Sequence, residues 1–334
     1  QHTGWPRRIP LLRHDVDRTV PSPLRILLHY PVLNTGGAER STLRLLAGLA
    51  DRGCEVHLVL TVKGGRLEPQ IDPRVHVNHL RDTVGHVPAS VSGLGDAFRV
   101  MTERVKWSWG RLQQAWRSRH FARMHVDAAI CGSTGLSPGF VCNVLDARRR
   151  FVFVRSDPRM VGDTRWGKNV HRFHRSIDAY LCVSESVKRS MQVVYPELAG
   201  KCVTAYNLLD ADTMWARSEG DLDPFAEYRG VPCVLSVCRL QEVSKGLRRM
   251  VEVHRRLLDA GVLHTWHVLG DGPDLDLLKR AIDEHGVAAT FKLHGSIANP
   301  FPYYRHADLC AVLSRYEGLC GVVNEARVLE RPVI

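Results

Sequence analysis

The 334-residue chain has no hydrophobic run long enough to cross a membrane. A spanning helix needs about 18 or more consecutive apolar residues, whereas the runs here are short, such as the one at residues 180–183. Internal repeats and low-complexity segments are also missing, which argues against solenoid and disordered proteins. With 44% hydrophobic and 24% charged residues, the composition is that of a folded globular protein.

Paired cysteines at metal-binding spacing are absent as well. The nine cysteines occur singly, and no C-x-x-C pair is present, which disfavours a zinc ribbon or a thiol redox motif. Several cysteines lie in apolar, strand-like runs. Dispersed cysteines of this kind are typical of a reducing compartment, so we expect a cytoplasmic protein.

Acidic residues are fewer than basic ones: the chain has 35 Asp and Glu and 46 Lys and Arg, which gives a formal net charge of +11. A basic chain favours anionic partners such as phosphates, acidic lipids or nucleic acids, and the charge alone does not choose among them. No nucleic-acid recognition motif occurs and the charge is scattered, so nucleic-acid binding ranks lowest and we expect no nucleic-acid partner.

Short β-type apolar runs alternate with longer amphipathic stretches along most of the chain. The apolar runs lie at 24–30, 54–62, 75–80, 127–131, 151–155 and 178–184, and then at 232–240, 263–270, 290–295 and 308–314. This alternation predicts an α/β fold with parallel sheets covered by helices on both faces. Near-continuous apolar strands are what burial on two sides requires.

The composition also predicts a division into domains. We expect a loose basic arm at 1–23, a first Rossmann-like domain at 24–207, an acidic linker containing Gly and Pro at 208–231, and a second Rossmann-like domain at 232–334. A compact α/β domain rarely ends on a bare strand such as the final RPVI. We therefore expect that the second domain is truncated, and that this piece alone is poorly active or unstable.

The first apolar run leads into NTGGAER (34–40). A strand followed by a Gly pair and a helix start can receive an anion, since Gly36 and Gly37 let the backbone approach a ligand and free N–H groups point outward. The segment is neither the G-x-G-x-x-G fingerprint nor a P-loop. A tight βα turn with no ligand is an equally good interpretation.

Basic residues follow the first strand of the second domain. Arg239 and Lys245 lie at its carboxyl end, where ligands bind in open α/β sheets, and two cations there suit a pyrophosphate. Alternatively, both are solvated loop residues. Gly270, in the turn after 263–270, has a structural role first and forms a possible pocket wall second.

The final stretch RYEGLCGVVNEARVLERPVI places two glutamates around a glycine turn. A helix starting near Gly321 would present the free N–H groups of Cys320, Gly321 and Val322 to an oxygen of a phosphate or sugar. Carboxylates accept hydrogen bonds from paired hydroxyls, so Glu317 and Glu325 suit a ribose and a hexose. The alternatives are a surface acid for Glu317 and a charge that complements the helix dipole for Glu325.

The order and spacing of these motifs resemble the family 4 retaining glycosyltransferases, which have the two-domain GT-B fold. The matching segments are NTGGAER, LSVCRL with SKG, VLGDGPDL, HGSIANPFPYYRHADLCAVLSRYEG and the Glu317-x7-Glu325 pair followed by RPVI. The resemblance extends over residues 24–334. The glutamate pair with its tail is fairly specific, whereas the Gly pair is not.

The resemblance implies an enzyme that moves a sugar from a UDP- or GDP-sugar to an acceptor hydroxyl with retained anomeric configuration. The acceptor would be a glycan or a lipid-linked sugar, in polysaccharide or glycolipid biosynthesis. Arg239 and Lys245 would hold the diphosphate, Glu325 the ribose, and Glu317 would approach the donor sugar. No cofactor or metal is expected, because the two cations neutralise the leaving diphosphate.

Other residues take roles from the same resemblance. Gly37 would lie near the phosphate and the acceptor, and Gly295 and Ile297 would border the base. Many relatives carry a histidine after the strand at 151–155, where this chain has Arg155, Ser156 and Asp157. Arg155 and Asp157 are therefore candidate catalytic residues. The substitution also leaves open a non-catalytic GT-B-like protein that binds nucleotide-sugars or polyanions.

A basic, aromatic segment at 98–125 carries seven Arg or Lys and one acid. Apolar side chains recur at steps of three and four residues, which predicts one apolar helical face: Phe98, Met101, Val105, Trp109, Leu112 and Trp116. We favour a helix packed on the sheet of the first domain. The alternative is an interfacial helix on an anionic membrane.

Two short motifs resemble metal ligands. DAD (210–212) lies in the predicted linker, and HRFH (171–174) has no cysteine or acid in ligand register, so we expect no metal at either.

Overall fold

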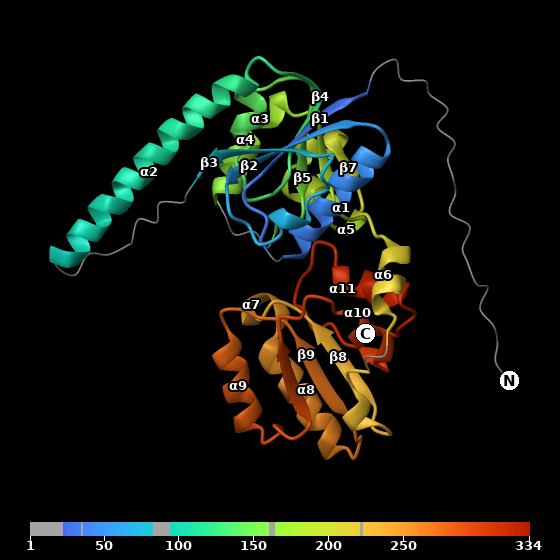
Figure 1. Cartoon of the computed structure of the whole chain (residues 1–334). Coiled ribbons are helices and arrows are strands. Elements are labelled where there is room, and N and C mark those ends of the chain that lie inside the picture. The colour runs from blue at the N-terminus through green and yellow to red at the C-terminus, as the bar shows by residue number, and fades with distance from the viewer. Residues whose placement is uncertain (1–22, 35, 83–93, 160–163, 221–222) are drawn as a thin grey trace.

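The computed structural model describes residues 23–34, 36–82, 94–159, 164–220 and 223–334. These residues form two lobes stacked end to end, each built around a parallel sheet with helices on both faces (Figure 1). The predicted α/β class is therefore confirmed. The predicted N-terminal arm lies outside the described residues, apart from residue 23.

The first lobe contains a seven-stranded sheet in the order β3-β2-β1-β4-β5-β6-β7. Its strands are β1 (Arg25–Tyr30), β2 (Glu55–Val62), β3 (His76–Arg81), β4 (His125–Cys131), β5 (Asp146–Val154), β6 (Ala179–Cys182) and β7 (Cys202–Thr204). All neighbouring pairs are parallel. The central strands are buried along nearly their whole length, as in Leu27 and Leu28 of β1, and this explains their continuous apolar sequences.

Helices join these strands as crossovers. They are α1 (Gly37–Asp51), α2 (Leu94–Phe121), α3 (Gly139–Asn143), α4 (Thr164–Phe173) and α5 (Glu185–Val194). The start of α5 follows from its sequence, because the Ser184 hydroxyl accepts a hydrogen bond from the Val187 amide at 3.2 Å. Such a side-chain cap satisfies one of the amides that a helix leaves free at its amino end.

The second lobe repeats the same winding with four strands, in the order β10-β9-β8-β11. The strands are β8 (Cys233–Val237), β9 (Thr265–Leu269), β10 (Phe291–Gly295) and β11 (Leu309–Cys310), and the helices are α7 (Glu242–Lys245), α8 (Leu247–Asp259), α9 (Leu275–Glu284), α10 (Phe301–His306) and α11 (Gly321–Val328). Val333 of the final RPVI forms a parallel bridge to Cys310 of β11.

Residues of the predicted linker pack into the second lobe. The stretch contains α6 (Ala211–Ser218), and Met214 and Phe225 are buried in the same core cluster as Leu235 of β8. Val234, the neighbouring residue of β8, faces the opposite core with Trp266. The second sheet is therefore buried on both faces, one of which is covered partly by the segment between the sheets.

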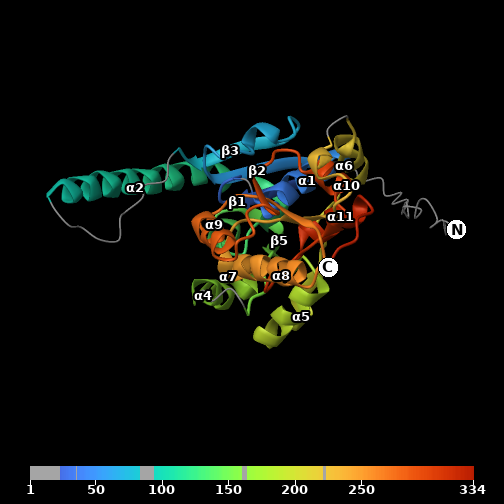
Figure 2. The same cartoon turned by 90° about the horizontal axis from the view of Figure 1, so that it is seen from below.

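Helix α2 contradicts the arrangement that we favoured from the sequence. Figures 1 and 2 show it projecting away from the first lobe, and only its carboxyl-terminal part packs near β3. Trp109, Leu112 and Trp116 are 61%, 64% and 70% exposed, and Met101 and Val105 are also exposed. The side chain of Phe98 lies outside the described residues. The expectation of a packed apolar face was wrong because periodicity identifies a face without identifying what covers it.

Across the described parts of the chain, no helix combines the length and apolarity needed to span a membrane. All nine cysteines are free thiols, and five of them are buried.

Candidate functional site

In each sheet, the direction in which successive strands are added reverses at one strand. In the first lobe β1 lies between β2 and β4, and in the second lobe β8 lies between β9 and β11. At such a switch point the loops after adjacent strands run in opposite directions and leave a crevice at the carboxyl ends of the strands, where ligands bind in this class of fold. The predicted site residues follow these strands.

The Gly pair after β1 opens helix α1. Gly36 is the N-cap residue, with φ −77° and ψ 165°, and no side chain caps the helix. A Cβ on Gly36 would lie 3.1 Å from Cδ of Glu39, whereas a Cβ on Gly37 would meet nothing within 4 Å. Neither glycine has a positive φ. Backbone strain and protein packing therefore do not explain a glycine at position 37, and the space over it is open to a ligand.

Arg155 lies just after β5 and connects the loops of the first lobe. Its Nε donates to the Gly132 carbonyl at 2.9 Å, and Nη2 donates to the Thr42 hydroxyl at 3.0 Å. Nη1 lies 3.3 Å from both the Ser41 hydroxyl and the Asn207 side-chain carbonyl. Burial lowers the pKa of Arg155, yet arginine keeps its charge in proteins. The guanidinium thus joins α1 to the ends of β4 and β5.

Asp157 is not brought together with the other predicted residues. Asp157 is only 6% exposed, and its carboxylate forms an ion pair with Arg159 at 2.6 Å. The Ser190 hydroxyl donates a second hydrogen bond at 3.1 Å. These bonds, led by the one from Arg159, lower the pKa of Asp157. This geometry holds the loop after β5 against α5.

Arg239 and Lys245 both follow β8, and only the Lys245 side chain is paired with an acidic residue among the described residues. Arg239 is exposed, and within the described residues its guanidinium has no hydrogen-bond or ion-pair partner. Lys245 at the end of α7 forms an ion pair with Glu317, whose Oε1 also accepts a hydrogen bond from the Ser314 hydroxyl at 2.7 Å. The structure therefore brings Lys245 and Glu317 together across 72 residues of sequence.

The predicted glycine of the β9 loop has a packing role. Gly270 has a φ of +144°, and a Cβ there would lie 2.9 Å from the carbonyl carbon of Cys238. The loop after β9 therefore closes against the loop after β8. Gly295, with a φ of +69°, has open space around it, and Ile297 is partly buried against the core that covers β8.

Helix α11 begins at Gly321 with Cys320 as its N-cap residue and no side-chain cap. A Cβ on Gly321 would meet nothing within 4 Å, and Val322 lies half-buried behind it. Burial raises the pKa of the Cys320 thiol, so the thiol stays protonated. The Cys320 sulfur lies near the Val322 and Val323 amides, and as a weak acceptor it leaves this helix start able to receive an anion or a hydroxyl oxygen.

Glu325 projects from α11 into the junction between the lobes. Its Oε2 accepts a hydrogen bond from the Tyr304 hydroxyl at 3.0 Å, and its Oε1 lies 3.6 Å from Nη2 of Arg44 on α1. Burial and the Glu325 carboxylate raise the pKa of Tyr304, so its hydroxyl stays protonated and donates. Glu325 thereby receives a hydrogen bond from its own lobe and a longer ion pair from the first lobe.

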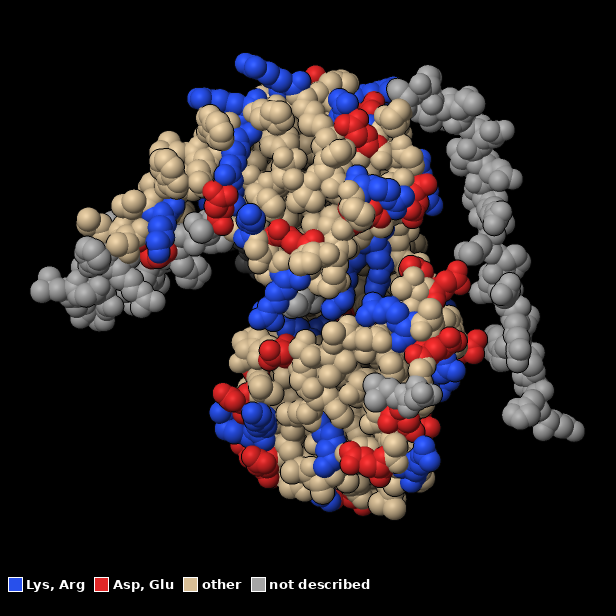
Figure 3. All heavy atoms as spheres, in the orientation of Figure 1, with Lys and Arg blue, Asp and Glu red and all other residues tan. Residues whose placement is uncertain are grey.

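Sequence reasoning missed a group of arginines at this junction. Burial and the nearby Arg217 of α6 lower the pKa of Arg40, and Arg44 is also close to it. Figure 3 shows Lys and Arg gathered at the waist between the lobes. The four-residue spacing of Arg40 and Arg44 places them on one side of α1, and this was the available signal.

The lobes also touch through backbone. The Ser184 hydroxyl donates a hydrogen bond of 2.7 Å to the Gly318 carbonyl. A Cβ on Gly318 would lie 2.8 Å from the carbonyl carbon of Arg155 and 3.2 Å from Cα of Ser156. The glycine between Glu317 and Cys320 is therefore required by the close approach of the first lobe. The sequence indicated a turn there and not this contact.

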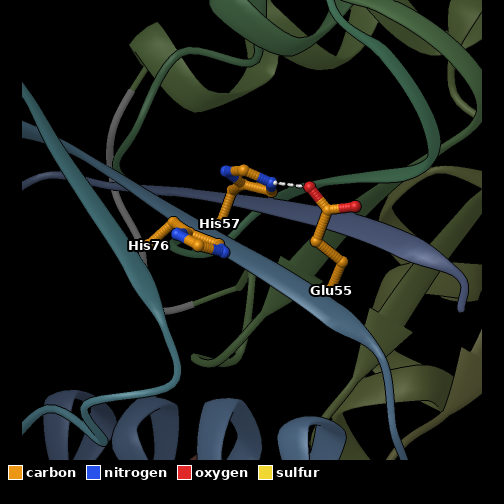
Figure 4. Close-up of side chains that lie close together, drawn as sticks. All are labelled: Glu55, His57 and His76. Atoms are coloured by element: carbon orange, nitrogen blue, oxygen red, sulfur yellow. Dashed lines mark hydrogen bonds and ion pairs between the residues drawn. The ribbon is translucent and has the colours of Figure 1, made fainter.

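One group of possible metal ligands occurs among the described residues, away from this junction. Glu55 and His57 of β2 and His76 of β3 have ligand atoms within 4.8 Å of one another (Figure 4). Glu55 accepts from His57 at 2.8 Å and lies 2.9 Å from Nε of Arg25. The carboxylate is thus already engaged, and the cluster is an ion pair beside stacked imidazoles.

The two short motifs set aside as metal sites have local structural roles. Asp210 is the N-cap of α6 and accepts a hydrogen bond from the Thr213 amide at 3.0 Å. His174 contacts the His171 carbonyl at 2.9 Å within one helical turn.

Known proteins resemble this chain in the sequences of both lobes. A family model described as Glycosyl transferases group 1 matches residues 231–334. Among curated proteins, 2-deoxystreptamine N-acetyl-D-glucosaminyltransferase from Niallia circulans is 28% identical over 188 residues, which is 51% of this chain and 46% of the relative. The matched part therefore spans less than half of that relative's length.

Solved structures share the fold at low sequence identity. TarM of S. aureus, in a complex that includes UDP, has a TM-score of 0.68 at 12% identity, covering 93% of this chain and 85% of its own. Anabaena HepE with UDP has a TM-score of 0.66 at 16% identity, covering 93% and 79%. These matches confirm the two-lobed GT-B fold predicted from the sequence. The model for Glycosyltransferase Family 4 matches residues 35–213, more than half of the chain, and this protein therefore belongs to Glycosyltransferase Family 4.

Proposed function

We propose that this protein is a metal-independent, retaining glycosyltransferase that moves a sugar from a nucleotide-sugar to an acceptor hydroxyl. One observation carries the proposal. Arg239 and Lys245 follow β8 and α11 follows β11, the neighbouring strands at the switch point of the second sheet, and Gly37 opens the helix that follows the equivalent strand of the first. Such an arrangement would offer donors for a diphosphate from one lobe and open space for an acceptor beside the other.

The diphosphate would be held by Arg239 and Lys245. Arg239 is exposed and unpaired within the described residues, so it can fork two phosphate oxygens without first breaking an ion pair. Lys245 would exchange its pairing with Glu317 for a phosphate. That exchange would release the Glu317 carboxylate to accept hydrogen bonds from the hydroxyls of the donor sugar.

The ribose would be held by Glu325. The Tyr304 hydroxyl fixes one carboxylate oxygen, and the other faces Arg44 at the longer distance of 3.6 Å. A vicinal diol could displace this weak interaction and keep the Tyr304 bond. Gly295 and Ile297 would border the base, and Arg155 would position the loops of the first lobe beside the reacting sugar.

Charge at this junction supports a reaction without a metal. The leaving diphosphate gains negative charge as the glycosidic bond breaks, and fixed cations and helix-start amides can stabilise that charge. Arg239, Lys245 and α11 supply such groups. The similar structures of TarM and HepE contain UDP, and another structure of HepE contains UDP-glucose, so a UDP-sugar is the first donor to test and a GDP-sugar the second.

The acceptor would be a glycan or a lipid-linked sugar in polysaccharide or glycolipid assembly in the cytoplasm. The exposed apolar stripe of α2, with basic residues beside it, supports an anionic membrane surface as a further partner. Tryptophan and arginine on one helix suit the headgroup region of a bilayer.

Nucleotide release by the full-length protein from a panel of UDP-, GDP- and ADP-sugars tests the proposal. We expect release with a UDP- or GDP-sugar in the presence of EDTA, and a product whose anomeric proton shows retained configuration by NMR. Absence of both turnover and nucleotide binding across the panel would defeat it. Binding without turnover would instead favour the non-catalytic alternative, which the arginine at position 155 supports.

A further inference from the structure

An open groove lies between the root of α2 and the rest of the first lobe. Its volume is about 710 Å³, and pockets for small ligands usually have about 300–1,000 Å³. One wall is a flank of α2 with Trp107, Arg111 and Arg119, and the other contains Arg81 at the end of β3 and Asn143 at the end of α3. The transfer reaction proposed above uses none of these residues.

The charged groups of this groove are all positive. Three guanidinium groups line it, from Arg81, Arg111 and Arg119, and no carboxylate does so among the described residues. The acid that follows Arg81 in the sequence, Asp82, forms an ion pair with Arg117 at 2.9 Å. Burial, followed by the positive charge of Arg111, lowers the pKa of Arg81, because both disfavour the charged form. An anionic group in the groove would offset this repulsion.

The groove also offers neutral groups that suit a sugar. Trp107 is 42% exposed, and its ring lies beside the Arg111 guanidinium, whose carbon is 4.9 Å from the ring centre. Oε1 of Gln114 accepts a hydrogen bond from Nε of Arg81 at 2.8 Å, and Nη2 of Arg81 contacts the same oxygen. These contacts leave the Gln114 amide nitrogen to donate to a ligand, and Asn143 adds a second amide. An indole ring and two amides match the apolar face and the hydroxyls of a sugar.

The position of the groove relates it to the proposed acceptor. Arg81 is the last residue of β3, and the parallel strands β1, β2 and β3 are neighbours in the sheet. Neighbouring strands lie about 4.8 Å apart, so the carboxyl ends of β1 and β3 are about 10 Å apart. The helix that follows β1 opens at Gly37, over which the space is free. A glycan of several sugars whose reacting hydroxyl lies near Gly37 can therefore reach the groove along this edge.

The exposed apolar stripe of α2 lies on the other side of the helix. With 3.6 residues per turn, Trp107, Arg111 and Gln114 fall on one side, and Trp109 and Trp116 fall on the opposite side, where they are 61% and 70% exposed. The groove and the stripe are therefore separate surfaces, and a partner on the stripe would leave the groove open.

We propose that this groove binds an anionic segment of the acceptor, a glycan chain that carries carboxylate or phosphate groups. The proposal rests on the transfer reaction proposed above and names the class of its acceptor. A guanidinium can donate two parallel hydrogen bonds to a carboxylate or a phosphate, so the three arginines match the anionic groups. The indole and the amides match the sugar rings, which a free anion lacks.

Isothermal titration calorimetry without a donor sugar tests the proposal. The anionic probes are a galacturonic acid tetrasaccharide and a phosphorylated mannose tetrasaccharide, which distinguish a carboxylate from a phosphate. Maltotetraose is the neutral glycan, and inorganic phosphate is the free anion. Because the arginines and the sugar-binding groups act together, we expect at least one anionic tetrasaccharide to bind about tenfold or more tightly than maltotetraose or inorganic phosphate.

The groove variant is Arg111→Gln with Arg119→Gln, at two exposed positions. The matched control is Arg189→Gln with Arg280→Gln, which removes the same charge from exposed positions on α5 and α9. A hydrogen bond to a charged group contributes about tenfold to binding, so the groove variant should bind the tetrasaccharide about 100-fold more weakly. At physiological ionic strength the control should stay within about twofold of the unmodified chain.

A second pair of variants tests the sugar ring. Trp107→Ala should weaken tetrasaccharide binding at least about fivefold, because the indole contributes apolar contact area. Trp116→Ala, on the opposite side of α2, should leave the affinity unchanged.

Failure of both anionic tetrasaccharides to bind would overturn the proposal, as would equal losses in the groove variant and its control. Inorganic phosphate that binds as tightly as the tetrasaccharides, or full tetrasaccharide affinity in Trp107→Ala, would assign the groove to a free anion and also overturn it. Calorimetry needs neither donor nor turnover. Failure of the transfer reaction would instead appear as absent nucleotide release with glycan binding intact.

Discussion

The close contact between Gly318 and the Arg155 backbone predicts that a side chain at position 318 would disturb the packing of the two lobes against each other. The perturbation is Gly318→Ala, which adds one methyl group. That carbon would lie 2.8 Å from the Arg155 carbonyl carbon and 3.2 Å from Cα of Ser156, whereas ordinary contacts lie at 3.4–4 Å. The clash is with backbone, which cannot rotate away as a side chain does. The Arg155 carbonyl oxygen is closer still, so the Gly318 loop must move by more than 0.6 Å, which is the difference between 3.4 and 2.8 Å for the carbonyl carbon alone.

The cost follows from two terms. Overpacking of this kind costs about 1–3 kcal/mol. Displacement of the loop also strains the hydrogen bond from Ser184 to the Gly318 carbonyl, which contributes about 1 kcal/mol. The sum is about 2–4 kcal/mol against the arrangement that places Glu317 beside the first lobe. At 1.4 kcal/mol per tenfold, kcat/KM should fall roughly 30- to 700-fold.

Steady-state nucleotide release with an active donor measures this effect, and a thermal melt checks folding. Gly200→Ala is the matched control, because a Cβ at that exposed position meets nothing within 4 Å. Each sheet has its own core, so Gly318→Ala should melt close to the unmodified protein. A kcat/KM within twofold of the unmodified protein would refute the idea that this contact sets the site.

Three further predictions follow from the same structure. Gly37→Ala should reduce kcat/KM at least about tenfold, because the space over Gly37 that we assign to a ligand would be filled. The melting temperature should be unchanged or slightly higher, because alanine favours the helix. Full activity would show that no ligand approaches there. Burial lowers the pKa of His29 to about 3 and, together with adjacent histidines, those of His254 and His267 to about 4. These histidines stay neutral in the folded protein, so their contribution to the free energy of unfolding is present above the unfolded pKa of 6.5 and is lost as the pH falls toward 4. At pH 5 each histidine lowers the free energy of unfolding by about 2 kcal/mol relative to pH 7. A melting temperature that is equal at pH 5 and pH 7 would contradict this. Dialysis against EDTA should leave both the melting temperature and nucleotide release unchanged, and restoration of lost activity by Mg²⁺ or Mn²⁺ would argue against the proposed role of Arg239.

Much of the fold could be predicted because burial on two sides leaves a strong mark in the sequence. Strands such as β1 and β8 are short apolar runs between amphipathic stretches, and their alternation predicts parallel sheets. The three-residue strand β7 (Cys202–Thr204) was missed, since so short a run carries no periodicity. The packing of α2 was predicted wrongly, since Trp109 and Trp116 mark an apolar face in either environment.

For the candidate site, the sequence predicted which residues follow the strands but not which side chains contact one another. The loops that follow strands predicted where Arg239, Lys245 and Glu317 lie, because parallel strands bring their carboxyl ends to one edge. The sequence could not show that Lys245 pairs with Glu317, or that Arg155 joins several loops. Such contacts join side chains to groups that lie 23 to 114 residues away in the sequence.

Nucleotide release from a UDP-sugar in the presence of EDTA tests the central claim most directly, measured for the full-length protein and for its Arg239→Ala and Lys245→Ala variants. The account predicts metal-free release by the unmodified protein and a loss of about 10²-fold or more in kcat/KM for each variant, since each removes a cation that stabilises the leaving diphosphate. Release that requires a divalent metal, or that survives both substitutions, would contradict it.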